Sequence, residues 1–205
     1  MGYLLQFVPF VKALMLTGSM SFGAAKVSSD IDLLVITAPK RLYTARFFVS
    51  LWAALTGWRR KPFESNLAGK FCINHFMTSE NFDILPQTEA NAKAHRFMVK
   101  IWDREGEHER LMRENFWIRK YNLIPVSIEQ LEFVKAAFPI ERPVFFAVFR
   151  RIWEWILFAK LGDMVEMKLA KWQKNKINSS LNLLESTSDI FISDSDLRLW
   201  GRDYS

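Results

Sequence analysis

The chain has 205 residues, of which half are apolar and 15% aromatic, so it can bury a hydrophobic core and is not a disordered linker protein. Its formal net charge of +6 favours anionic partners, such as nucleotide phosphates, nucleic acid or an acidic membrane surface, without choosing among them. Cys72 is the only cysteine, which excludes an internal disulfide and favours a reducing, cytoplasmic location.

The first 86 residues have the pattern of a small α/β sheet. A short apolar run that ends at a Gly-Ser turn predicts a strand over residues 10–17, and "IDLLVIT" predicts a second strand over 31–37. Apolar residues recur at helical spacing over 41–58, and "KFCINHFM" predicts a third strand over 70–77. We therefore expect an α+β fold with a small mixed sheet, and we assign residues 1–86 to an α/β domain.

After Pro86, charged and aromatic residues alternate with a helical period, which predicts a helical C-terminal region over 87–205. The expected helices lie at 88–101, 105–121, 128–138 and 144–176. The tail "SDIFISDSDLRLWGRDYS" contains a short strand candidate.

Two apolar runs need a choice between core and membrane. The runs over 41–58 and 143–162 are interrupted by charged residues, so we interpret both as packed amphipathic helices rather than membrane-associated segments. Trp153 and Trp155 cannot both face inward on one helix. One of them is therefore expected to be partly exposed, where another subunit of a homo-oligomer could cover it.

Asp30 and Asp32 flank a single isoleucine at the start of the second expected strand, in "SDIDLLVIT". Residues i and i+2 of a strand project from the same face, so the two carboxylates should lie side by side. Adjacent negative charges repel unless a cation lies between them, and oxygen ligands of this kind suit Mg²⁺, which takes the rest of its shell from water and substrate phosphates. The alternative is a polar strand entry whose carboxylates cap nearby amides.

Gly18 and Ser19 end the first expected strand. Glycine lets the backbone approach a ligand closely, and the serine hydroxyl lies beside backbone amides, so such a turn can hold phosphate oxygens, although the same pair also forms ordinary turns. If the first two strands are neighbours, this turn and the two aspartates meet at one rim of the sheet. That arrangement favours phosphoryl or nucleotidyl transfer.

The Gly-Ser pair, a ten-residue spacer and Asp30-Ile31-Asp32 resemble the signature of the nucleotidyltransferase superfamily related to DNA polymerase beta, which includes kanamycin-type and minimal nucleotidyltransferases. The segments "FVPFVKALMLTGS" and "RENFWIRKY" also resemble a group of bacterial nucleotidyltransferase-domain proteins. The resemblance implies a nucleotidyltransferase core in which Gly18 and Ser19 bind the triphosphate. It also implies that Asp30 and Asp32 are catalytic, bind Mg²⁺, and serve the transfer of a nucleoside monophosphate from an NTP to a hydroxyl acceptor.

One position departs from the superfamily pattern. A later strand commonly adds a third carboxylate, and the strand expected here offers Asn74, which cannot accept the acceptor proton. Asp83 or Glu64 are the alternative acids. The departure leaves open a second hypothesis, an inactive nucleotide-binding or regulatory module of the same fold. A third, a basic protein that binds membrane surfaces or nucleic acid, rests on charge and aromatic content alone.

Overall fold

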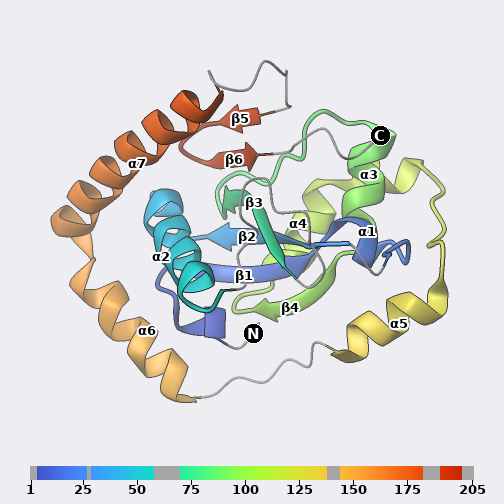
Figure 1. The fold of residues 1–205 in the computed structure, drawn as a ribbon, viewed down its shortest axis with the longest axis horizontal. Coiled ribbons are helices and arrows are strands. Elements are labelled where there is room, and N and C mark those ends of the chain that lie inside the picture. Colours follow the sequence, from blue (N-terminus) through green and yellow to red (C-terminus); the bar gives the residue numbers. More distant parts are fainter. Residues whose placement is uncertain (1–3, 27–28, 58–69, 138–143, 182–189, 200–205) are drawn as a thin grey trace.

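A six-stranded mixed sheet in the order β4-β1-β2-β3-β6-β5 forms the centre of the computed structural model (Figure 1). The structure describes residues 4–26, 29–57, 70–137, 144–181 and 190–199. The strands are β1 (Val11–Leu16), β2 (Ile31–Thr37), β3 (Phe71–Thr78), β4 (Val99–Asp103), β5 (Ile190–Ile192) and β6 (Asp196–Leu199). Strands β2 and β3 run parallel, and the other neighbouring pairs are antiparallel.

Helices cover both faces of this sheet. They are α1 (Gly18–Ser21), α2 (Leu42–Leu55), α3 (Glu89–His95), α4 (Glu107–Glu114), α5 (Ile128–Ala137), α6 (Val144–Ile156) and α7 (Ala159–Leu181), with 3-10 turns η1 (Leu4–Phe7) and η2 (Phe116–Lys120). Alternate strand residues divide into two buried clusters: Leu14 and Val35 pack with α2, whereas Met15 and Leu34 pack with residues of α3, α4 and η2. The expected α+β class with a mixed sheet is therefore confirmed.

The expected strands over 10–17, 31–37 and 70–77, and the helix over 41–58 between the last two, are confirmed as β1, β2, β3 and α2. Each strand is a short apolar run bounded by turn residues, and α2 buries one stripe against the sheet. The strand candidate in the tail is also confirmed, because β5 and β6 form a hairpin whose second strand pairs with β3.

The helix expected over 88–101 is wrong in its second half. Helix α3 ends at His95, and Val99–Asp103 forms β4, which pairs with β1 at the edge of the sheet. The bare edge of β1 offers a full set of hydrogen-bond partners, and burial of Val99, Ile101 and Trp102 outweighs the local preference for helix. The part of the chain after residue 86 is therefore not purely helical, while its assignment as a separate region stays a prediction.

The helix expected over 144–176 is two helices, α6 and α7. Ala159 begins α7 with a φ of +56°, just after a corner at Leu157 and Phe158. A Cβ added to Gly162 would lie 1.8 Å from the carbonyl oxygen of Leu157, so only glycine permits this close packing. The chain turns sharply here, and both helices follow the outer edge of the molecule (Figure 1).

Helix α7 packs against α2 and supplies the cap that α2 lacks locally. The N-cap residue of α2, Arg41, makes no side-chain capping bond. Instead the Glu166 carboxylate accepts hydrogen bonds from the amides of Tyr43 at 2.8 Å and Thr44 at 2.7 Å. The carboxylate therefore satisfies two amides of the first turn and complements the helix dipole.

Helix α6 places charged residues toward the protein and large apolar residues toward solvent, which is the reverse of the usual arrangement. Its inward face carries Arg150 and Glu154, whereas Trp155 on the outward face is 79% exposed. Trp153 is half-buried, so the expectation that one of the two tryptophans is exposed is confirmed. Within the described residues, no helix combines the length and apolar character needed to cross a bilayer.

Candidate functional site

The end of β1 and the start of β2 meet at one rim of the sheet. Leu16 pairs with Leu33, and the Thr17 amide donates to the carbonyl oxygen of Asp32 at 3.0 Å. The chain then turns through α1 before it returns to β2. The Gly-Ser turn and the two aspartates therefore lie at the same rim of the sheet, as the sequence predicts.

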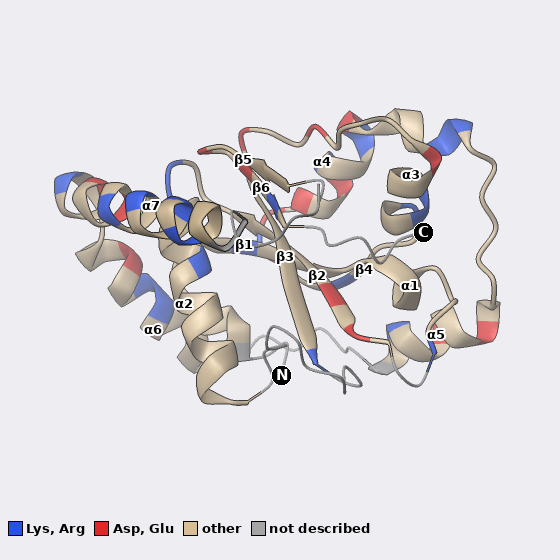
Figure 2. Cartoon of the chain, turned by 45° about the horizontal axis from the view of Figure 1, so that its top comes forward, with Lys and Arg blue, Asp and Glu red and all other residues tan. Residues whose placement is uncertain are grey.

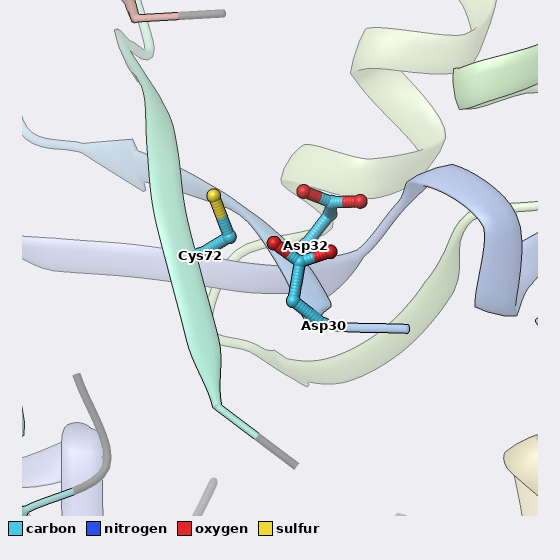
Figure 3. A group of neighbouring side chains, drawn as sticks. All are labelled: Asp30, Asp32 and Cys72. Carbon is cyan, nitrogen blue, oxygen red and sulfur yellow. The ribbon is translucent and has the colours of Figure 1, made fainter. Parts of the chain in front are cut away.

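Asp30 and Asp32 lie side by side with Cys72, and the three side chains turn toward a shared space (Figure 3). One potential ligand atom from each lies within 4.8 Å of the other two. Asp32 is buried, with 4% of its surface exposed, whereas Asp30 and Cys72 are half-buried. The group thus has one deep carboxylate and two further side chains that are partly accessible to solvent.

Parallel pairing of β2 with β3 brings Cys72 to this site. The Ile31 amide donates to the carbonyl oxygen of Lys70 at 2.8 Å, and the register places Asp32 opposite Cys72. Our sequence analysis missed Cys72 as a site residue. Both strand starts follow polar segments of the sequence, and a parallel alignment of these two starts is the signal that could have found it.

Gly18 is in direct contact with the deep carboxylate. Its φ is +70°, and a Cβ built on it would lie 2.4 Å from Oδ2 of Asp32. The glycine is required twice over, because the backbone is left-handed and because the carboxylate occupies the space of a side chain. Ser19, the next residue, is half-buried in the same turn.

Asn74 lies beside the acids at the position where the third carboxylate was expected. Its Nδ2 is 3.5 Å from Oδ1 of Asp32, at the outer limit of a hydrogen bond, and the residue is buried. Asp83 is exposed and follows the far end of β3, whereas the cluster is at the start of that strand. Glu64 lies outside the described residues, and among those that are described the metal-capable group contains two carboxylates and a thiol.

The pairing of β2 with β3 changes register just beyond this site. The register shifts between Asp32 and Leu34, so that Leu34 pairs with His75. His75 is buried, with its Nε2 3.3 Å from Oδ1 of Asp196, and it stacks edge-on against His95. His75 therefore contributes to packing inside the protein. Burial lowers the pKa of His75, although Asp196 opposes that shift.

The donor set defines what the site can hold. Two carboxylates bind hard cations such as Mg²⁺ and Mn²⁺, and the adjacent thiol adds affinity for softer ions such as Zn²⁺ and Cd²⁺. A cation here would relieve the repulsion between two adjacent acids, one of them buried. The arrangement fits a divalent cation that is shared with an anionic ligand on the solvent-accessible side of Asp30 and Cys72.

Comparisons with known proteins give no relative from which a function could be transferred. No family model, no curated protein and no solved structure matches the chain.

Proposed function

We propose that this protein is a Mg²⁺-dependent nucleotidyltransferase that moves a nucleoside monophosphate from an NTP to a hydroxyl acceptor. The observation that carries the proposal is the meeting of Asp30 and Asp32 at a rim where Gly18 touches the deeper acid. Two neighbouring carboxylates next to a glycine turn with a φ above zero form a place for a cation and a polyphosphate together.

The residues fit the metal that the proposal requires. Asp30 and Asp32 would hold Mg²⁺, which neutralises the polyphosphate and lowers the pKa of an attacking hydroxyl. Gly18 and Ser19 would hold the β and γ phosphates through the backbone of the turn. In the reaction, the acceptor oxygen bonds to the α phosphorus, the bond from that phosphorus to pyrophosphate breaks, and the hydroxyl proton passes to water.

The Asn74 amide favours a second candidate, a nucleotide-binding module that does not turn over. Asn74 is adjacent to Asp32 and cannot serve as a base. In that case nucleotide and Mg²⁺ raise the melting temperature by mass action, and no pyrophosphate is released. Asn74→Asp would then create the missing base, and a gain of turnover in this variant would identify the wild-type protein as the inactive module.

A pyrophosphate-release assay tests the leading proposal. The four NTPs are supplied in turn with Mg²⁺ and with acceptors of each open class: antibiotics, nucleotides, tRNA and protein hydroxyls. We expect release with at least one pair and a loss of at least about a hundredfold in Asp32→Asn. Asp83→Asn is the matched control, since that acid is exposed at the far end of β3.

The two outcomes are well separated. Nucleotide-dependent stabilisation without release supports the module, whereas neither stabilisation nor release contradicts both candidates. A cytoplasmic location, with its NTP pools and reduced thiols, fits either one, and Cys72 as the sole cysteine is consistent with it.

A further inference from the structure

The outward face of α6 is a continuous apolar stripe that the rest of the described chain covers only in part, since Phe149 contacts Phe7 and the other members are more than a third exposed. Its members recur at intervals of three and four residues, so they line one side of the helix, and we call them the α6 stripe: Phe145, Val148, Phe149, Ile152, Trp155 and Ile156. Each of the six is at least 40% exposed, and Phe145 and Trp155 exceed 70%. Isolated exposed apolar residues are normal, but a continuous stripe of six marks a contact surface.

Two polar residues of α6, Arg150 and Glu154, are turned away from this stripe and toward the protein, whereas Arg151 is exposed. The Glu154 carboxylate accepts from Nη1 of Arg104 at 2.8 Å and from the amide of Phe10 at 3.0 Å. Arg150 donates to the carbonyl oxygen of Gln6 at 2.7 Å and is buried. Because these bonds fix the rotation of α6 about its axis, the stripe cannot turn inward to be buried.

The charge next to the stripe is basic. Residues 144–181 contain seven Lys and Arg but three acids, and each acid bonds to a group elsewhere in the protein: Glu154, Asp163 and Glu166. Four lysines of α7 are exposed, and we call them the α7 lysines: Lys160, Lys168, Lys171 and Lys176. Lys and Arg recur along α6 and α7 in Figure 2, on the side of the sheet opposite α1.

The sequence favoured a packed helix over a membrane-associated segment for residues 143–162, but the exposure of the α6 stripe argues against that choice. We propose that α6 and α7 form a surface that binds an anionic lipid bilayer peripherally. The α6 stripe would enter the boundary between headgroups and acyl chains, where Trp and Phe are favoured, and the α7 lysines would contact the acidic headgroups. Stable attachment of this kind needs an apolar and an electrostatic contribution together, and the two helices supply one each.

Charge complementarity favours a bilayer over the other occupants. A second copy of the chain, docked stripe to stripe, would bring Arg151 and the lysines of both copies together without an exposed acid of α6 to pair with them. Nucleic acid would leave the aliphatic part of the stripe, including Val148 and Ile152, without a suitable contact. An anionic leaflet satisfies the apolar and the basic residues at once.

Vesicle co-sedimentation tests this inference on the full chain. We expect binding to vesicles of about 70% phosphatidylcholine and about 30% phosphatidylglycerol. Binding should be weaker at high salt, and vesicles of phosphatidylcholine alone should bind little protein. Lys168→Glu with Lys171→Glu should weaken binding by about 30-fold, because each lysine near an anionic leaflet strengthens binding by about fivefold. Arg119→Glu with Lys120→Glu on η2 is the matched control and should leave binding unchanged.

A second pair of variants tests the apolar contribution. Ile152→Glu with Trp155→Glu should weaken vesicle binding at least about tenfold while the melting temperature is kept, since both side chains are exposed. Phe133→Glu on α5, where Phe133 is 73% exposed, is the control for a surface apolar residue outside the stripe.

Three results would overturn the inference. One is the absence of binding to the anionic vesicles at low salt. Another is a concentration-dependent dimer that Trp155→Glu dissociates while vesicle binding is absent, which would assign the stripe to a second copy. The third is oligonucleotide binding that the α7 lysine variants abolish, again without vesicle binding. None of these depends on nucleotidyl transfer, so the outcome is independent of the proposed function.

Discussion

Replacement of Gly18 by alanine should break the contact on which the candidate site depends. A Cβ at residue 18 would lie 2.4 Å from Oδ2 of Asp32 and 3.1 Å from its Cγ, well inside van der Waals contact. The carboxylate belongs to a side chain that is 4% exposed, so it has little room to move away. Either the acid is displaced from the cluster or the turn shifts.

The expected loss of stability has two parts. A left-handed backbone costs an alanine about 1–2 kcal/mol. Overpacking against a fixed neighbour adds about 1–3 kcal/mol. Gly57 separates these parts, because its φ is also +70° and a Cβ there would meet nothing within 4 Å. Gly57→Ala should therefore be destabilised by the backbone contribution alone, and Gly18→Ala by both contributions.

Urea unfolding of the two variants measures the difference. We expect Gly18→Ala to be less stable than Gly57→Ala by about 1–3 kcal/mol. In an Asp32→Ala background most of the overpacking disappears, so the double-mutant cycle should give a coupling of at least about 1 kcal/mol. The Mg²⁺-dependent rise in melting temperature should also be lost in Gly18→Ala and retained in Gly57→Ala.

Equal losses in the two glycine variants would refute the reasoning. So would the absence of coupling with Asp32→Ala, because the penalty at residue 18 would then be a matter of backbone conformation and not of the carboxylate. In either case the turn and the acid would not be in contact, and the main support for a shared phosphate and metal site would be gone.

Three further predictions concern other parts of the molecule. Glu166→Ala should lower the free energy of unfolding, measured in urea, by about 2 kcal/mol, since two amides of α2 lose their acceptor. Glu132→Ala, at an exposed position of α5, should change it by less than about 0.5 kcal/mol. Burial and the neighbouring His75 lower the pKa of His95 to about 3 in the folded protein. In the unfolded chain this imidazole takes up a proton below a pH of about 6.5, so the unfolded state binds more protons than the folded state in mild acid. Protonation linked to His95 should therefore lower the free energy of unfolding by about 2 kcal/mol from pH 7.5 to pH 5, and a flat profile would contradict this. Cd²⁺ should give a thiolate charge-transfer band in the ultraviolet that is missing in Cys72→Ser, while stabilisation by Mg²⁺ should survive that substitution.

The arrangement of the candidate site was more predictable from the sequence than the elements around it, such as β4 and α6. Asp30, Asp32 and Gly18 are close in the chain, and the alternation of strand residues with a turn between two strands suffices to bring them together. Cys72 needed the register of a parallel pair whose partners are 40 residues apart in the sequence, from Asp32 to Cys72, and no local pattern encodes it. The roles of these residues in binding or catalysis stay predictions.

The errors in the fold have the same origin. Residues 88–101 contain neither glycine nor proline, so nothing local separates α3 from β4, and the strand forms because the edge of β1 is available. In α6 the helical period was evident, but the usual rule places apolar residues inward. The rule fails there because Arg150 and Glu154 have specific partners inside, which only the folded structure reveals.

Strand β6 has a consequence for how the protein is made. It covers the free edge of β3, where Met77 pairs with Asp196, so the sheet is completed by residues near the end of the described chain. During synthesis on the ribosome, more than a hundred further residues must be made after β3 before its second neighbour, β6, is available for pairing. A prematurely terminated product would present a bare apolar β3 to other nascent chains, which makes such fragments prone to aggregate and suitable substrates for chaperones and proteases.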